Sequence, residues 1–131
     1  MDSIKSLASS SKGFFDIVGS KIYPDLEIPE SDLSGKRVLV TGANSGVGRE
    51  LALTVARWGA ETYLLCRDDK KAQAAKFDIV EKTGNHNVHV EIVDFSSFIS
   101  IREFVRRWNM RKGDSKLVDI LFSNAGVYSL T

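Results

Sequence analysis

The chain has 131 residues, of which 43% are hydrophobic and 27% are charged, so it is long enough and apolar enough for one globular domain. Its 18 basic and 17 acidic side chains nearly cancel, and the resulting net charge of +1 gives no long-range field to attract nucleic acid. The single cysteine, Cys66, cannot form an internal disulfide, and no apolar run is long enough to predict a transmembrane segment.

Residues 1–35 differ in composition from the rest of the chain, because they hold both prolines, Pro24 and Pro29, and show little periodicity. We expect an N-terminal extension that packs on the domain as a partly ordered arm. A secretory or transit peptide does not fit, since no apolar core is present and Asp2 and Asp16 add acidic charge. Cytoplasm is the default expectation for location, with membrane association through this arm as the alternative.

From Lys36 onward, short apolar strands alternate with segments of helical period, which is typical of a parallel α/β sheet. Strands are predicted at residues 37–41, 62–66, 88–93 and 118–122. The first, second and fourth are almost continuously apolar, as expected of strands covered on both faces. The sequence therefore predicts one domain over residues 36–131.

Three helices are predicted between these strands. The first begins near Ser45 and ends at Gly59, and three apolar residues share its inner face at helical spacing: Val47, Leu51 and Val55. The second runs from about Asp68 to Lys82, and its expected inner face consists of Ala72, Ala75 and Ile79.

The third predicted helix begins at Ser96 or Ser97, either of which is a natural N-cap. Its expected apolar stripe is Phe98, Ile101, Val105 and Trp108. Arginines occupy the opposite side, at positions 102, 106, 107 and 111. Because the net charge is near zero, we interpret them as a solvated helix face and expect no nucleic-acid partner.

A glycine-spaced turn follows the first strand, in the run Thr-Gly-Ala-Asn-Ser-Gly-Val-Gly that ends at Gly48. A bound pyrophosphate needs backbone N–H groups and a helix N-terminus, and side chains obstruct both. Gly42 is expected to make the tight turn, Gly46 to let the phosphates approach, and Gly48 to let the helix pack against the sheet. The stretch therefore predicts a dinucleotide-binding site.

The spacing Thr-Gly-x-x-x-Gly-x-Gly resembles that of the short-chain dehydrogenase/reductase family. Two further family elements stand in the same order, an acid after the third strand, Asp94, and Asn124-Ala125-Gly126 after the fourth. The run Leu-Leu-Cys-Arg-Asp is similar to the retinol-dehydrogenase-like branch. The resemblance implies a Rossmann-type doubly wound parallel sheet with strand order 3-2-1-4, truncated after the fourth strand.

The resemblance also implies roles for several residues. Asp94 would accept from the exocyclic amine of adenine beside Phe95, or would simply cap the third helix. Asn44 and Ser45 either help to hold the ribose and phosphates or supply side chains that favour the turn. The whole expected cofactor-binding set is Gly42, Asn44, Ser45, Gly46, Val47, Gly48, Arg67, Asp94, Phe95, Asn124, Ala125 and Gly126.

Charge at the end of the second strand indicates which dinucleotide is bound. A carboxylate there accepts a hydrogen bond from the ribose 2′-hydroxyl of NAD, whereas the 2′-phosphate of NADP needs a cation. The chain has neutral Cys66 followed by Arg67, which predicts NADP(H) over NAD(H). Asp68 and Asp69 are the competing candidates for the ribose, but both are better explained as helix-capping residues.

Catalysis in this family depends on a tyrosine that acts as general acid or base, with a lysine four residues later. No tyrosine of the chain has that partner, since Glu27 follows Tyr23, Arg67 follows Tyr63, and only three residues follow Tyr128. No catalytic residue is assigned, and Asn124 is not the family's catalytic asparagine. We expect the NADP(H)-binding portion of a short-chain oxidoreductase, inactive alone, whose full-length form acts on a lipophilic alcohol or carbonyl; the alternative is a noncatalytic dinucleotide-binding or interaction module.

Three smaller expectations concern residues outside the glycine turn. The fourth strand would be an open edge with Val118, Ile120 and Phe122 uncovered, so association through that edge is expected. His86 and His89 have no companions at metal-ligand spacing, so no metal site is expected. Cys66 is expected to be a small buried apolar side chain rather than a nucleophile.

Overall fold

A computed structural model describes residues 29–126 of the chain, and residues 1–28 and 127–131 lie outside the description. The chain divides into two units after Ser31, and everything below concerns the second unit. The extension expected at residues 1–35 lies mostly outside the described residues, so its boundary stays a prediction. Leu33 does contact the domain, through a hydrogen bond from its N–H to the carbonyl of Trp58 at 2.7 Å.

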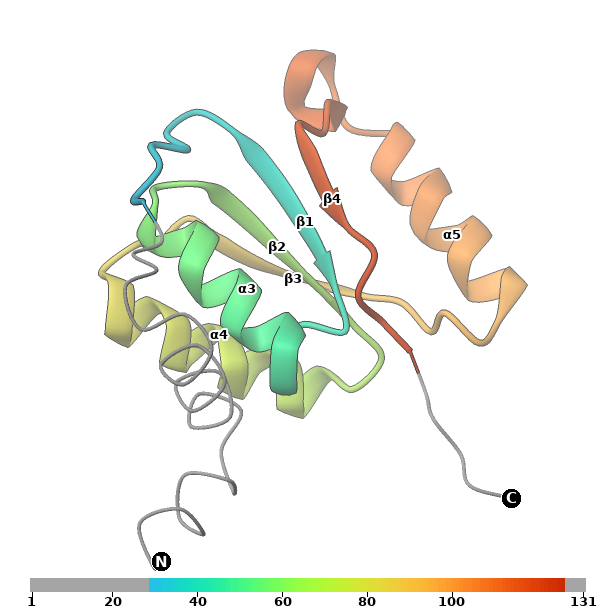
Figure 1. The fold of residues 1–131 in the computed structure, drawn as a ribbon. Coiled ribbons are helices and arrows are strands. Elements are labelled where there is room, and N and C mark those ends of the chain that lie inside the picture. The colour runs from blue at the N-terminus through green and yellow to red at the C-terminus, as the bar shows by residue number, and fades with distance from the viewer. Residues whose placement is uncertain (1–28, 127–131) are drawn as a thin grey trace, which may run out of the picture. The chain divides into compact units, whose positions relative to one another are not determined.

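Four parallel strands form the sheet, in the order β3-β2-β1-β4 (Figure 1). Their bounds are β1 Arg37–Thr41, β2 Glu61–Cys66, β3 Val88–Ile92 and β4 Ile120–Phe122. The predicted order 3-2-1-4 is confirmed. Because all four strands run in the same direction, the loops at their carboxyl ends meet along one edge of the sheet, where open α/β sheets bind ligands.

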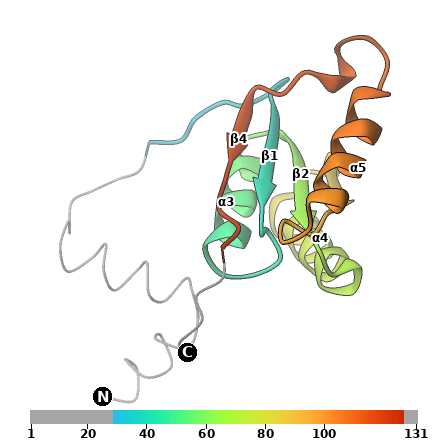
Figure 2. The same cartoon turned by 90° about the vertical axis from the view of Figure 1, so that its right-hand side faces the viewer.

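Helices cover both faces of this sheet (Figures 1 and 2). Helices α3 (Gly46–Arg57) and α4 (Asp69–Thr83) lie on one face, and α5 (Phe98–Asn109) lies on the other, followed by the short 3₁₀ helix η1 (Gly113–Lys116). Two apolar clusters separate along the same division. Val38, Val40 and Leu64 are fully buried beneath α3 and α4, whereas Tyr63 and Leu65 pack with Trp108 beneath α5.

The predicted apolar stripe of α5 is wrong in two positions. Phe98 and Val105 are 82% and 46% exposed, and the buried residues are Phe104 and Trp108. The packed side is fixed by polar anchors as well as by apolar contacts, because the indole Nε1 of Trp108 donates to the carbonyl of Lys116 at 2.8 Å. Trp108 was part of the predicted stripe, so the error lies in assigning Phe98 and Val105 to the packed side in place of Phe104.

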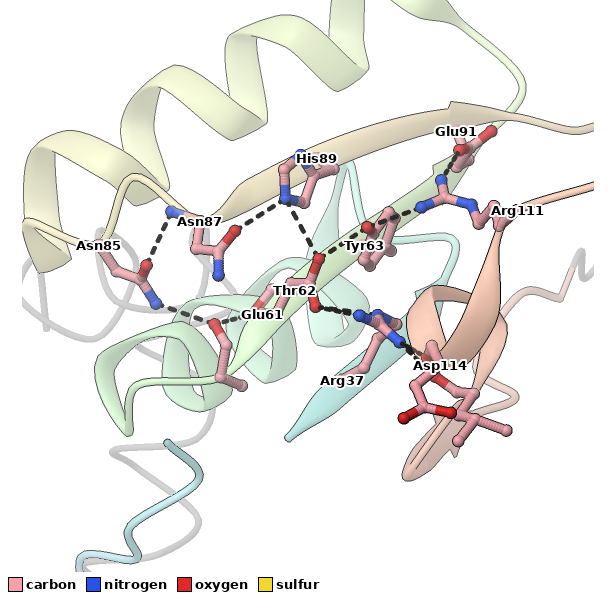
Figure 3. A network of polar contacts seen from close by, with 12 residues as sticks. Arg37, Glu61, Thr62, Tyr63, Asn85, Asn87, His89, Glu91, Arg111 and Asp114 are labelled. Atoms are coloured by element: carbon pink, nitrogen blue, oxygen red, sulfur yellow. Dashed lines mark hydrogen bonds and ion pairs between the residues drawn. The ribbon is translucent and has the colours of Figure 1, made fainter. Parts of the chain in front are cut away.

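Arg111 belongs to this packed side and not to the solvated arginine face that the sequence predicts. Its guanidinium lies 4.1 Å from the centre of the Trp108 ring, donates to the hydroxyl of Tyr63 at 2.9 Å and contacts Glu91 at 2.7 Å (Figure 3). Planar guanidinium groups stack on aromatic rings while their N–H groups bind oxygen at the rim. Arg111 thereby joins the C-terminal end of α5 to β2 and β3.

A second arginine closes the same network at the amino ends of the strands. Arg37 contacts Glu61 at 2.8 Å and donates to the carbonyls of Asp114 and Leu117, both at 2.8 Å (Figure 3). The other carboxylate oxygen of Glu61 accepts from Tyr63 at 2.8 Å. Although partial burial works against the ionised form, hydrogen bonds from Tyr63 and Arg37 keep the pKa of Glu61 below its ordinary value.

The edge strand β4 is shorter than predicted and exposes a different residue. Ile120 and Phe122 pack partly against the core beneath α3, whereas Leu121 is 57% exposed. The preceding residue, Asp119, accepts the backbone N–H of Arg37 on its carboxylate at 2.7 Å. The prediction of an uncovered surface is therefore wrong for Ile120 and Phe122. It is confirmed for Val118, which is 40% exposed.

The inner face predicted for α3 is also wrong at its first residue. Val47 is 47% exposed, and the buried positions are Gly48, Ala52, Leu53, Val55 and Ala56. Small residues dominate that face because the helix lies close to the strands. The α4 prediction is confirmed, since Ala72, Ala75 and Ile79 are buried.

Candidate dinucleotide-binding site

A hollow of about 680 Å³ opens at the carboxyl ends of the strands. Its wall contains every residue of the predicted cofactor-binding set except Gly46 and Gly48. The fold thus brings together segments that lie far apart in sequence, the turn after β1, the ends of β2 and β3, and Asn124 to Gly126 after β4. A hollow of this size is typical of small-molecule and cofactor sites.

The glycines of the turn after β1 serve distinct geometric needs. Gly42 has φ of +64° and Gly46 has φ of +55°, a region that residues with a side chain rarely adopt. Gly48 has ordinary torsions but no free space, because a Cβ there would lie 2.5 Å from the Asn124 amide nitrogen and closer still to the Gly42 carbonyl oxygen. Gly48 therefore allows the start of α3 to contact both the turn and the segment after β4.

The hydroxyl of Thr41 ties the segment after β4 to the end of β1. It accepts the backbone N–H groups of Asn124 at 2.9 Å and Ala125 at 2.8 Å, and donates to the carbonyl of Phe122 at 3.3 Å. The Asn124 side chain adds a hydrogen bond to the Thr41 carbonyl at 3.2 Å. These bonds position Asn124 and Ala125 on the wall of the hollow, and sequence inspection gave Thr41 no role of its own.

The first turn of α3 is arranged to receive an anion. The N-cap residue Ser45 has extended torsions and makes no side-chain capping hydrogen bond, and the first turn holds no acidic residue. Backbone N–H groups at a helix start lack intrahelical acceptors, and the helix dipole favours negative charge there. A phosphate group fits this position because the glycine turn leaves the approach open.

Two cations stand on the wall beyond β2. Arg67 follows the strand directly, and Lys71 lies one helical turn later in α4; both are exposed and line the hollow. Sequence inspection missed Lys71, although its spacing of four residues from Arg67 was the signal that could have found it. This wall of the hollow thus holds two cations beside the carboxylates of Asp68 and Asp94.

The neighbouring carboxylates are engaged in capping and side-chain hydrogen bonds of α4. Asp68 is the N-cap residue, and its side chain accepts the N–H of Lys71 at 3.1 Å. Asp69 accepts from the side chain of Gln73 at 3.2 Å. The prediction that Asp68 caps a helix is confirmed, and this role occupies one of its oxygens.

The acid after β3 lies on the same wall. The Asp94 carboxylate accepts the N–H and the hydroxyl of Ser96 at 2.9 and 2.6 Å. These hydrogen bonds hold the pKa of Asp94 below its ordinary value, and the positive charge of Arg67 adds to the effect. The N-cap of α5 is Ser97, so the alternative in which Asp94 caps that helix is wrong.

Cys66 lies at the base of the hollow and is 3% exposed. Burial raises the pKa of its thiol, and backbone hydrogen bonds from Ala43 and Asn44 only partly oppose this. A thiol that stays protonated is a poor nucleophile, which agrees with the predicted role of a small buried side chain.

No group of three or more histidine, cysteine or acidic side chains in residues 29–126 is placed to hold a metal ion. His89 instead stacks on Tyr63 with ring centres 4.7 Å apart. Across the same range, no helix is long and apolar enough to cross a membrane.

Comparison with known proteins identifies the family. The sequence model for short chain dehydrogenases matches residues 36–131, the whole sheet-forming part of the chain. The chain belongs to the short-chain dehydrogenase family. The resemblance stated from the glycine turn, Asp94 and Asn124 to Gly126 is thus confirmed.

Relatives of this short-chain dehydrogenase chain include retinol dehydrogenases. Human retinol dehydrogenase 13 is 44% identical over 98 residues, which cover 75% of this chain and 29% of the relative. Mouse retinol dehydrogenase 12 is 39% identical over 120 residues, covering 92% and 35%, and bovine dehydrogenase/reductase SDR family member 12 is 32% identical over 123 residues, covering 93% and 37%. The chain spans about a third of the length of these relatives.

Solved structures agree with the fold. A short chain dehydrogenase from Escherichia coli CFT073 in complex with NADPH aligns with a TM-score of 0.65 and 30% identity, covering 76% of this chain and 41% of that one. A short chain dehydrogenase from Shigella flexneri 2a in complex with NADP aligns with a TM-score of 0.65 and 31% identity over the same shares. The Rossmann-type arrangement predicted from sequence is therefore shown by structure as well.

Proposed function

We propose that this chain forms the NADP(H)-binding part of a short-chain oxidoreductase that reduces carbonyls or oxidises alcohols by hydride transfer. The observation that carries the proposal is that Arg67 and Lys71 line the same hollow as the glycine turn. The α3 start would receive the pyrophosphate of NADP(H), and the two cations would receive its 2′-phosphate.

The preference for NADP(H) over NAD(H) rests on charge. A 2′-phosphate needs cationic donors, and Arg67 and Lys71 supply two. Asp68 uses one carboxylate oxygen to cap α4, and Asp69 accepts from Gln73 and does not line the hollow. The NADPH and NADP complexes of the aligned structures support the same choice.

In the proposed complex, each part of the hollow binds a different part of the dinucleotide. The first turn of α3 and Gly46 hold the pyrophosphate, Asp94 and Phe95 border the adenine, and Asn124 to Gly126 lie along the ribose. Phe95, which is 39% exposed, offers an apolar surface at the rim. The nicotinamide ring of the bound dinucleotide would supply the hydride in carbonyl reduction or accept it in alcohol oxidation; the residues described here would bind and orient the carrier.

We further propose that the oxidoreductase takes a lipophilic alcohol or carbonyl. The support is the similarity to proteins named retinol dehydrogenases, at 39 to 44% identity over the shared part. Substrate assays would require a protein that also includes a Tyr-x-x-x-Lys segment.

The cofactor assignment is tested by calorimetric titration of the chain with NADPH and with NADH. We expect NADPH to bind more tightly than NADH. Arg67→Asp should lower the affinity for NADPH by about 10-fold to 100-fold, the range for loss of a charge-assisted hydrogen bond, and leave the affinity for NADH unchanged. Lys70→Asp is the matched control, because Lys70 is exposed on α4 but does not line the hollow. Equal NADPH affinity in wild type and Arg67→Asp would refute the NADP(H) assignment, and no binding of either nucleotide would refute the function itself.

A further inference from the structure

The outward side of α5 carries large apolar side chains beside arginines. Phe98, Ile99 and Met110 are 82%, 71% and 69% exposed, and Arg102 and Arg106 stand between them. We call these five residues the outer ridge of α5. The sequence suggested only a solvated arginine face here, because Phe98 was assigned to the core.

The outer ridge points away from the packed side of the helix. Ile99, Arg102, Arg106 and Met110 follow one another at intervals of three, four and four residues, so they line up along the helix. Phe104 and Trp108, which face the sheet, lie on the opposite side. Neither apolar cluster of the sheet therefore covers Ile99 or Met110.

The arginines of the outer ridge differ from the other arginines of the same helix region. Arg107 donates to the carbonyl of Ile92 at 3.0 Å, and Arg111 binds Tyr63 and Glu91. Among the ion pairs of residues 29–126, none includes Arg102 or Arg106. Arg106 instead lies against the Met110 sulfur at 3.5 Å.

Lysines extend this positive charge past the helix. Lys112 is exposed before η1 and Lys116 is exposed within it. Of the exposed acids, Asp114 lies in η1, and Glu103, four residues after Ile99 and three before Arg106, lies on the same side of α5 as the outer ridge. From residue 102 to residue 116 the chain holds six basic and two acidic side chains, a local charge of +4 within a chain whose net charge is +1. Because Arg111 is paired with Glu91, the positive charge left around α5 comes from the other five basic side chains.

We propose that the outer ridge of α5 docks on an anionic lipid bilayer, with the helix lying along the membrane surface. Apolar side chains that flank cations suit the boundary between lipid headgroups and acyl chains. The apolar side chains insert there, and the cations bind the headgroup phosphates. Long arginine side chains reach the headgroups while their methylene stems stay among apolar groups. Nucleic acid fits less well, because Phe98, Ile99 and Met110 would stay exposed beside a phosphate backbone.

Vesicle sedimentation with the 131-residue chain tests this proposal. The vesicles contain phosphatidylcholine alone or phosphatidylcholine with 30% phosphatidylserine, and each is measured at low and at high salt. We expect binding to the phosphatidylserine vesicles, reduced by salt, and weak binding to phosphatidylcholine alone. Since each cation near such a surface changes partitioning about fivefold, Arg102→Glu with Arg106→Glu is expected to lower it by about 20-fold or more.

Two further double variants separate the ridge from other causes. Arg57→Glu with Lys70→Glu makes the same change in net charge at exposed positions on α3 and α4, and it is expected to keep most of the binding. Ile99→Gln with Met110→Gln keeps the charge and is expected to lose binding in part. All variants are compared by thermal unfolding and by NADPH titration, which should stay unchanged.

Several results would overturn the proposal. Binding that survives Arg102→Glu with Arg106→Glu would assign the membrane contact to another part of the chain. Equal losses in the two charge-reversal variants would mean that net charge alone acts. No binding to any vesicle by the wild-type chain would leave an acidic protein surface as the better partner for the ridge.

Discussion

The hydroxyl of Thr41 accepts the backbone N–H of Asn124 at 2.9 Å, across 83 positions of sequence. It also accepts the N–H of Ala125, so one buried oxygen satisfies two donors on the wall of the cofactor hollow. The last residue of β1 thus determines the path of the chain after β4.

Replacing Thr41 by valine keeps the shape of the side chain and removes that oxygen. We expect Thr41→Val to lower the free energy of unfolding by about 1–3 kcal/mol, the cost of leaving buried donors without an acceptor. Thr41→Ser, which keeps the hydroxyl, should lose much less. Urea denaturation of the two variants provides the comparison, and equal stability would show that the Thr41 oxygen is not needed.

Gly48 tests the close approach of α3 to the turn. A methyl group at this position overlaps the Asn124 amide, so Gly48→Ala should cost about 1–3 kcal/mol of stability and also weaken NADPH binding. Gly84→Ala is the control, because its φ of +70° imposes strain but its surroundings are open and distant from the hollow. Unimpaired NADPH binding by Gly48→Ala would contradict the assignment of the turn as a phosphate cradle.

Lys71 is expected to select NADPH together with Arg67. Because Lys71 is exposed, its removal in Lys71→Met should weaken NADPH by only about threefold to fivefold and leave NADH affinity unchanged. The neighbouring exposed residue gives the matched variant Lys70→Met, which should change neither affinity. An equal loss of affinity for NADH and NADPH in Lys71→Met would contradict a role for Lys71 in selecting NADPH.

His89 is expected to make stability depend on pH. Burial lowers its pKa, and the positive charges of Lys76 and Arg111 act in the same direction, while Glu61 and Glu91 oppose them. The unfolded chain therefore takes up the proton first as the pH falls. Stability from this group is complete above the unfolded value of about 6.5 and declines as the pH falls towards the lower folded value.

Urea midpoints of the wild type and of His89→Gln between pH 7.5 and 5.5 measure this contribution. The wild type should lose stability on acidification more steeply than His89→Gln. His86→Gln, at an exposed histidine of the same segment, is the matched control for the substitution itself. Identical slopes in wild type and His89→Gln would show that His89 does not contribute.

The family resemblance supplied the strand order, whereas local sequence patterns were sufficient for most of the hollow. The glycine spacing predicts a turn whose geometry requires glycine, and Arg67 follows an apolar strand whose end is easy to place. Side-chain partners were harder to predict. Thr41 acts through residues more than 80 positions away, and Lys71 matters only because α4 turns it towards the hollow.

Helix α5 shows why periodicity can assign the wrong face. Its sequence offers two apolar stripes that differ mainly in whether Phe98 or Phe104 faces the sheet. Trp108 belongs to both stripes, whereas the hydrogen bonds from Arg111 to Tyr63 and Glu91 mark the inner side that Phe104 shares. A count of apolar residues does not include those hydrogen bonds.

The position of β4 has a consequence for how ligand binding and folding are coupled. This strand has three residues and pairs on one side only, so among the described strands it is the least secured by the ladder. It nevertheless delivers Asn124 to Gly126 to the hollow. A bound dinucleotide would therefore stabilise the edge of the sheet against local opening. Its binding would slow amide hydrogen exchange in β4 more than in β1 or β2.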